Sequence, residues 1–106
     1  MGSKGKGANG GVFLVERYWA GVDGALLRAS LPRLERAARE MTSLGHPVEH
    51  IGSYLMVDDQ VVFSIMRGET APLVREANER AELPFDRIAE VKPHGFHALE
   101  KKGKTR

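Results

Sequence analysis

The chain has 106 residues, the length of one domain of ordinary size, so a large multi-domain enzyme is excluded. Hydrophobic residues make up 42% and charged residues 28%, a globular composition, and no apolar run approaches the roughly 20 residues that a membrane span needs. There is no cysteine, so disulfides, thiolate metal sites and a cysteine nucleophile are excluded. Residues 1–11 contain no apolar segment, and we predict no signal peptide and a cytoplasmic protein.

The net charge of +2 is unevenly divided along the chain. Residues 11–93 carry ten Lys or Arg and thirteen Asp or Glu, while the two ends carry six basic residues and one acidic residue. We expect residues 1–10 to be a disordered, basic, Gly-rich tail and residues 94–106 to be a mobile basic tail, around one domain of residues 11–93. That domain has no basic face with interleaved aromatic residues, so we interpret the basic tails as aids to solubility rather than as a nucleic-acid arm. Without a long apolar run, we expect no membrane partner either.

The first half of the domain has a strand pattern followed by a helix pattern. Residues 12–18 are mainly β-branched and aromatic and follow two glycines, which predicts a strand. From Asp23, apolar residues recur at three- and four-residue spacing, which predicts an amphipathic helix ending at Gly45. Because Pro32 removes a backbone donor inside this pattern, we expect a kink, or a helix that restarts with Ser30 as its N-cap.

The second half has two strand patterns, a helix pattern and a last strand. The apolar runs 48–57 and 61–66 are joined by a short polar turn, which predicts an antiparallel hairpin. A helix is predicted from Thr70 to residues 83–84, and a strand over about 86–91. The order β-α-β-β-α-β predicts an α+β, ferredoxin-like domain, with a four-stranded antiparallel sheet and both helices on one face.

The predicted strands do not alternate cleanly between apolar and polar residues. In the hairpin, the pattern places Ile51, Leu55 and Val57 on one face, and Val48, Tyr54 and Met56 on the other. Helices on one face only would leave an apolar patch of several hundred Å² exposed, more than soluble monomers usually show. We therefore expect a second copy to cover this face about a twofold axis, giving a homodimeric α/β barrel.

Several stretches resemble a family of small bacterial proteins long catalogued as a domain of unknown function. They are 13–17 (FLVER), 52–55 (GSYL), 62–64 (VFS) and, most specifically, 74–88 (VREANERAELPFDRI). The best-described member of that family is nickel-binding and nickel-responsive. The resemblance covers residues 12–92 and implies a ferredoxin-like fold, a dimeric barrel and nickel as cofactor, without assigning the nickel ligands to positions in this chain.

Histidine is the residue through which this chain could bind nickel. Imidazole and carboxylate are ligands that nickel accepts in a protein without thiolates. His94 and His97 are separated by two residues, which lets two rings converge in a turn, and His50 lies near the start of the second predicted strand. These three are the candidate metal ligands, and the alternative for His94 and His97 is a polar end to the last strand.

A small enzyme is the alternative function. Dimeric barrels of this kind serve as cyclases, isomerases and cofactor-free oxygenases of aromatic or polyketide-like metabolites. The candidate catalytic residues are His50 or Glu16 as proton acceptor and Tyr54 as donor. The candidate ligand-binding residues are Arg17, Tyr18, Trp19, Phe63, Arg67 and Asn78.

Each of these candidates also has a structural interpretation. Tyr54 suits the core or a dimer interface, Trp19 suits a cover over the core, and Asn78 could cap, line a pocket or face water. The chain has no phosphate-binding glycine loop, serine elbow or zinc-protease motif, so no reaction can be named. We predict a small homodimeric protein that binds a metal, nickel above all, or a small ligand.

Overall fold

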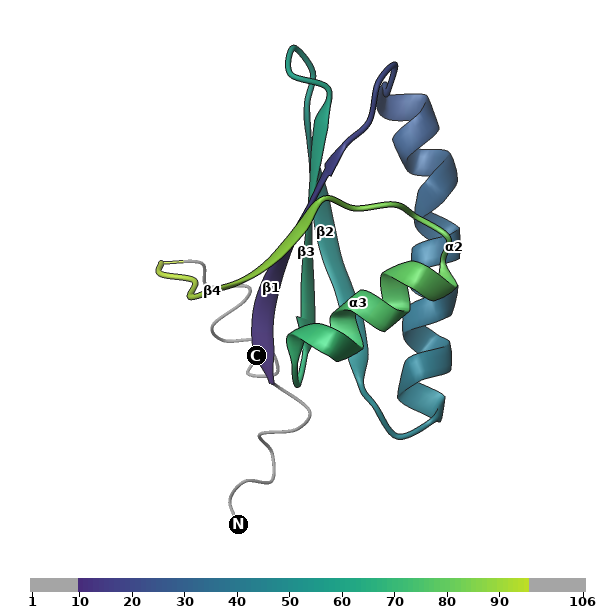
Figure 1. Cartoon of the computed structure of the whole chain (residues 1–106), viewed down its shortest axis with the longest axis vertical. Helices are drawn as coiled ribbons and strands as arrows, with labels where there is room; N and C mark the ends of the chain where they lie inside the picture. Colours follow the sequence, from purple (N-terminus) through teal and green to yellow (C-terminus); the bar gives the residue numbers. More distant parts are fainter. Residues whose placement is uncertain (1–9, 96–106) are drawn as a thin grey trace, which may run out of the picture.

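The computed structural model describes residues 10–95 (Figure 1). The order of elements is β-α-β-β-α-β, so the predicted α+β, ferredoxin-like fold is confirmed. The elements are β1 (Gly11–Tyr18), α2 (Gly24–Ser43), β2 (Val48–Met56), β3 (Val61–Gly68), α3 (Ala71–Arg80) and β4 (Arg87–Val91).

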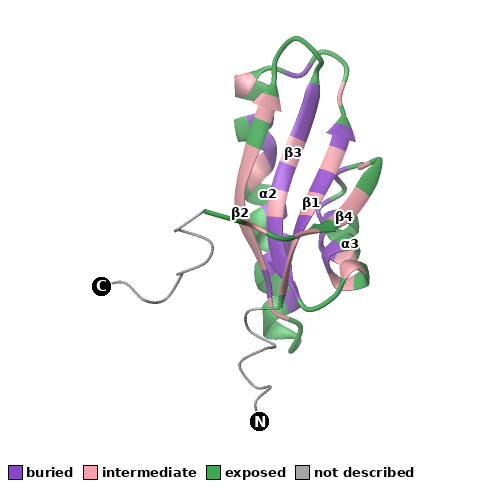
Figure 2. Cartoon of the chain, turned by 90° about the vertical axis from the view of Figure 1, so that its left-hand side faces the viewer, coloured by how far each residue is buried: buried purple, intermediate pink, exposed green. Residues whose placement is uncertain are grey.

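The four strands form one antiparallel sheet in the order β2-β3-β1-β4, so β2 and β4 are its edges. Both helices lie on the same face of this sheet (Figure 1). Figure 2 looks onto the opposite face, which no helix covers and in front of which the segment after β4 runs. We call it the open face. The sheet therefore has one face that packs in a core and one that meets solvent in the single chain.

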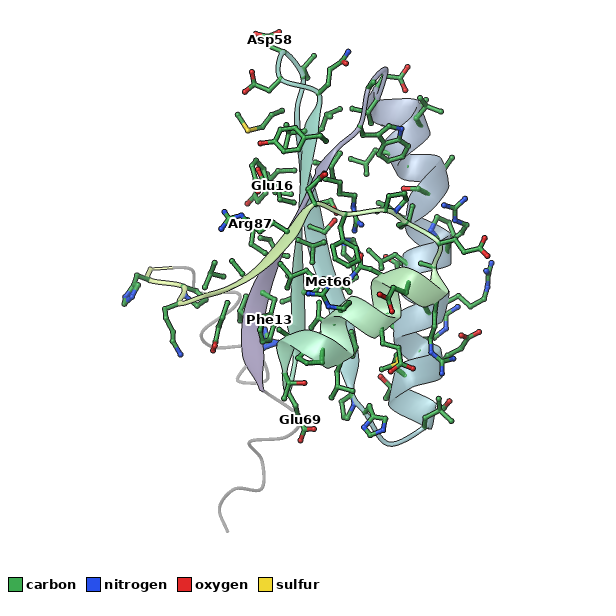
Figure 3. The ribbon with its side chains drawn as sticks, in the orientation of Figure 1. Phe13, Glu16, Asp58, Met66, Glu69 and Arg87 are labelled. Atoms are coloured by element: carbon green, nitrogen blue, oxygen red, sulfur yellow. The ribbon has the colours of Figure 1, made fainter. Side chains whose placement is uncertain are left out.

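The hydrophobic core fills the space between the sheet and the helices. Phe13, Val15 and Met66 point into it from the central strands, and Figure 3 shows Phe13 and Met66 on the helix side of the sheet. Leu34 of α2 and Val74 of α3 meet them. Burying each such large side chain stabilises the fold by roughly 1.5–3 kcal/mol. This packing holds in place the polar side chains that point to the same side.

The helix α2 continues across Pro32 without interruption. It begins after Asp23, whose carboxylate accepts the N–H of Leu26 at 2.8 Å. The alternative in which the helix restarts with Ser30 as N-cap is wrong, because the Ser30 hydroxyl lies inside the helix and donates to the Leu27 carbonyl. Pro32 is exposed, so its ring meets solvent, and the helix lacks only the backbone bond that a non-proline residue would donate there.

A β-bulge interrupts the pairing of β2 with β3 between His50 and Gly52. The extra residue reverses the alternation of side chains along the rest of the strand. Val48 is therefore buried in the core, whereas Tyr54 and Met56 line the open face. The prediction that these three side chains share a face is wrong, because a sequence pattern of period two takes no account of a bulge.

The predicted tails, residues 1–10 and 94–106, lie almost entirely outside the described residues. Their mobility stays a prediction. Within residues 10–95, no helix is long and apolar enough to cross a membrane.

Candidate functional site

Arg17 lies at the centre of a buried polar network between the sheet and the helices. It points from β1 to the helix side and is 4% exposed. Its Nη2 donates to Asn78 Oδ1 at 2.8 Å and to Ser64 Oγ at 3.2 Å. Its Nη1 donates to the carbonyls of Pro84 at 3.2 Å and Leu83 at 3.4 Å. The guanidinium thus joins β1 to β3, to α3 and to the loop before β4.

Every one of these acceptors is electrically neutral. Among the described residues, no carboxylate lies within 4.0 Å of the Arg17 guanidinium. Burial lowers the pKa of Arg17 to about 10, so the side chain still carries its charge at neutral pH. A buried charge without an ionic partner is costly. An anionic ligand would supply the partner that Arg17 lacks.

Asn78 is a residue of α3 and is fully buried on the side of the helix that faces the sheet. Its Nδ2 donates to the Val74 carbonyl at 2.8 Å and contacts the Met66 sulfur at 3.4 Å, which leaves Oδ1 facing Arg17. The amide therefore does not face water. Asn78, a predicted ligand-binding residue, therefore positions the guanidinium of Arg17, which is also a predicted ligand-binding residue.

A second branch of the network runs from Arg17 to the edge of the sheet. Ser64 Oγ lies 2.8 Å from Ser53 Oγ, which lies 2.9 Å from His50 Nε2. His50 Nδ1 lies 3.5 Å from the Glu35 carboxylate. Because a carboxylate can only accept, the proton of the neutral His50 ring is on Nδ1, facing Glu35, and Nε2 accepts from Ser53 Oγ. Ser53 has one proton, so its oxygen accepts from Ser64, whose own oxygen accepts from Arg17.

His50 is a buried, neutral imidazole. Its side chain is 4% exposed. Burial lowers the pKa of His50, and the opposing effect of the Glu35 carboxylate is smaller. The ring is therefore uncharged at neutral pH, which agrees with Nε2 acting as a hydrogen-bond acceptor. Chemically, this histidine can accept a proton.

A hollow of about 220 Å³ opens beside Arg17. Its lining residues are Arg17, Tyr18, Trp19, Arg33, Leu83 and Pro84, and we call it the arginine hollow. Arg33 reaches it from α2 and donates to the carbonyls of Ala81 at 3.1 Å and Glu82 at 3.3 Å. Two guanidinium groups and an indole thus share one small hollow. Three of the predicted ligand-binding residues meet here.

The open face is apolar, as the strand pattern predicted. It forms a broad hollow of about 1110 Å³, lined chiefly by Val12, Leu14, Ile51, Tyr54, Phe63 and Ile65. Tyr54 is 63% exposed and Met56 is 44% exposed. This surface resembles an interface that lacks its partner.

Glu16 lies on the open face, paired with Arg87 at 3.0 Å (Figure 3). A hydrogen bond to Glu16 raises the pKa of Tyr18. Tyr54 shares this face, whereas His50 points to the helices. The three predicted catalytic residues are therefore not brought together in one chain, and the cyclase, isomerase or oxygenase function stays a prediction.

Arg67 and Phe63 lie away from the arginine hollow. Arg67 is directly opposite Val12, which lines the open face, and is 6% exposed. Its Nε lies 3.7 Å from the Glu49 carboxylate, and its Nε and Nη2 have no hydrogen-bond partner among the described residues. The predicted ligand-binding residues thus form two groups, one on each face of the sheet.

The three predicted metal ligands do not converge. His50 faces the helices, His94 lines the open face, and His97 lies outside the described residues. Within residues 10–95, no group of three or more His, Asp or Glu side chains is placed to hold a metal ion. The described part of a single chain therefore does not fit a nickel site.

Sequence reasoning missed Glu35, Ser53 and Arg33. Glu35 and Arg33 are polar residues of the predicted amphipathic helix, and their spacing gives no sign of a partner elsewhere in the fold. Ser53 lies directly opposite Ser64 in the hairpin, a pairing that the predicted turn already implies. The bulge brings His50 to the same face as Ser53, and no local signal marks it.

Comparison with known proteins gives one informative result. No protein-family model and no curated protein matches the chain. The crystal structure of SCO4226 from Streptomyces coelicolor A3(2) is similar to this chain, with a TM-score of 0.69 and 16% identity over 79% of this chain and 99% of that chain. A likeness at this identity shows the fold alone. The predicted resemblance to the nickel-binding family is thus supported only for the fold.

Proposed function

We propose that the chain is a homodimeric binding protein for a small anionic molecule, held in the arginine hollow. One observation carries this proposal: Arg17 is a buried positive charge with only neutral acceptors, and it lines a hollow that Arg33 also lines. Guanidinium groups suit carboxylate and phosphate, whose oxygens match their planar donors. The negative charge of the ligand would balance the positive charge of Arg17, which no carboxylate of the described residues contacts.

The size and lining of the hollow narrow the ligand class. A volume of about 220 Å³ is below the roughly 300–1,000 Å³ of sites for drug-sized ligands, so the ligand is small. Since the two Nη groups of Arg17 already donate to four acceptors, Arg17 contributes mainly electrostatic attraction. Arg33 contributes hydrogen bonds from the rim, and Trp19 offers an aromatic wall. These features fit a small carboxylate or phosphate with a compact apolar part.

Thermal unfolding in the presence of inorganic phosphate or benzoate tests this binding. A ligand that binds only the folded state raises the unfolding midpoint with its concentration. We expect a rise for the wild type that is lost in Arg17→Met and in Arg33→Met, with chloride at equal ionic strength as the reference. Arg28→Met, an exposed position on the same helix as Arg33, is the matched control and should keep the response. An equal rise in Arg17→Met, or no rise with either anion, would contradict the proposal.

We also propose that two copies join through their open faces. The support is the extent of exposed apolar surface there, which includes Tyr54 and Met56. Light scattering at micromolar concentration should give twice the chain mass of 11.7 kDa. Phe63→Glu places a charge in the interface and should give single chains, whereas Arg36→Glu, on the exposed side of α2, should leave the dimer intact. A wild-type mass of 11.7 kDa would reject the dimer.

Nickel binding stays a prediction. Since one described chain does not bring three ligands together, a site would need His94 from both subunits at the joined open faces, or His97 in addition. Isothermal titration of tag-free protein with nickel tests this arrangement. Heat and retained metal that disappear in His94→Ala would support it. Absence of both in the wild type would contradict it.

A further inference from the structure

Ser53 sits beside a basic imidazole nitrogen. Its Oγ lies 2.9 Å from His50 Nε2, and His50 Nδ1 lies 3.5 Å from the Glu35 carboxylate. Because the Glu35 carboxylate can only accept, the imidazole proton faces Glu35, and the Ser53 hydroxyl donates to Nε2 of the neutral ring. A hydroxyl, a neutral imidazole and a carboxylate in this order form the arrangement that activates a serine.

We propose that Ser53 is a nucleophile toward small esters of carboxylic acids, with His50 as its general base. Glu35 is a positioning residue that holds the imidazole in the required tautomer. Ser64, held by Arg17, donates to Ser53 Oγ and stabilises negative charge on that oxygen. The reaction needs no anion in the arginine hollow, although Arg17 contributes to both sites.

Access distinguishes Ser53 from the other serine of the network. Ser64 is 1% exposed on the central strand β3. Ser53 is half-buried on β2, an edge strand with no further strand outside it. At this edge, a hollow of about 500 Å³ includes Glu35, Arg39 and His50 in its lining. Ser53 lines the hollow of the open face instead, so we place the ester at the edge of β2, between the hollow that His50 lines and the hollow that Ser53 lines.

The reaction balances with water as the only co-reactant. Ser53 Oγ bonds to the ester carbonyl carbon while His50 Nε2 accepts the hydroxyl proton. The ester C–O bond breaks, and His50 passes that proton to the leaving alcohol oxygen, which leaves an acyl-serine. Water then bonds to the acyl carbon, its proton moves to His50, and the proton returns to Ser53 Oγ as the acyl–serine bond breaks. One ester and one water give one acid and one alcohol.

Mass spectrometry of the full chain after reaction with p-nitrophenyl acetate, and with a fluorophosphonate probe, tests the proposal. We expect one adduct, at Ser53, that is absent in Ser53→Ala and forms roughly 10²- to 10⁴-fold more slowly in His50→Gln. Ser43→Ala is the control, since Ser43 is an exposed serine that lines the same hollow as His50, but its hydroxyl donates to the Glu40 carbonyl and not to an imidazole. An adduct at another residue, or one that persists in Ser53→Ala, would overturn the proposal.

The pH profile of wild-type labelling distinguishes a base from a structural histidine. The charged groups near His50 are Glu35 and Arg39 of α2 and Arg17 of β1, and Glu49, its neighbour on β2, lines the same hollow. Because burial lowers the pKa of His50, the rate should be constant at neutral pH and fall only below pH 6.5. Glu35→Gln should move this fall to lower pH, because the carboxylate favours the protonated ring. A rate that keeps rising into alkaline pH would contradict a histidine base, even if His50→Gln fails to fold.

One further variant separates this proposal from anion binding. Arg33→Met should lose the response of the unfolding midpoint to phosphate and keep the labelling of Ser53. Loss of labelling in that variant, with the fold intact by its unfolding midpoint, would contradict a reaction that needs no anion in the arginine hollow.

Discussion

Arg17 Nη2 donates to Asn78 Oδ1 at 2.8 Å, so an arginine of the first strand is held by an asparagine on the buried side of the second helix. The amide cannot turn away, because its Nδ2 donates to the Val74 carbonyl in the same helix. The position of the guanidinium is thereby fixed. It lines the arginine hollow, and it is connected through Ser64 to Ser53 and His50 by hydrogen bonds.

Asn78→Ala should destabilise the protein through this bond. The change leaves a buried guanidinium donor without its acceptor, which costs about 1–3 kcal/mol. Urea unfolding should show the loss as a lower free energy of unfolding. Glu79→Ala, an exposed neighbour on the same helix, should stay within about 0.5 kcal/mol of the wild type. Equal stability of Asn78→Ala and wild type would show that the bond contributes nothing.

His50 makes stability depend on pH. Because burial lowers its pKa in the folded state, the unfolded chain binds this proton more readily. The stabilisation of the folded state by neutral His50 is complete at pH values above 6.5, the ordinary pKa of histidine, and it is lost as the pH falls through the lower pKa of the folded state. The free energy of unfolding should therefore fall between pH 7 and pH 5, and His50→Gln should make that fall smaller. His46→Gln, at an exposed position, should leave it unchanged, and the same fall in both variants would refute this role of His50.

Pro32 weakens the helix that carries Arg33 and Glu35. Pro32→Ala restores a backbone donor and removes a ring that is unfavourable inside a helix, although the unfolded chain gains freedom in return. We expect a gain of about 1–3 kcal/mol in the free energy of unfolding, measured with urea. Arg36→Ala, one turn further along the exposed side, should change stability little. A loss of stability in Pro32→Ala would mean that the ring has a packing role on the surface.

The order of elements could be predicted because its signals are local. Asp23 and Thr70 cap the two helices, as their positions before the helix patterns indicated. Two features depended on contacts between segments. Pro32 is tolerated because its side of the helix faces solvent, and the bulge after His50 exists only through the pairing of β2 with β3. No periodicity within one segment reports either feature.

The site was predicted only in part, for the same reason. Arg17 and Trp19 were recognised as possible binding residues by their chemistry, and both line the arginine hollow. Asn78 was recognised only as a polar residue that could take several roles, since its partner is 61 positions away in the chain. Ser53 and Glu35 gained significance only when the bulge placed His50 between them. Residue types thus indicate which side chains can bind or react, but the tertiary structure decides which of them lie together.

An amide NMR titration of the full chain with inorganic phosphate is the most direct test of anion binding in the arginine hollow. The shifts should saturate and should concentrate at residues 17–19, at Arg33 and at residues 81–83, and they should vanish in Arg17→Met while persisting in Arg28→Met. Shifts that do not saturate, or that are confined to the basic ends of the sequence, would contradict the proposed site.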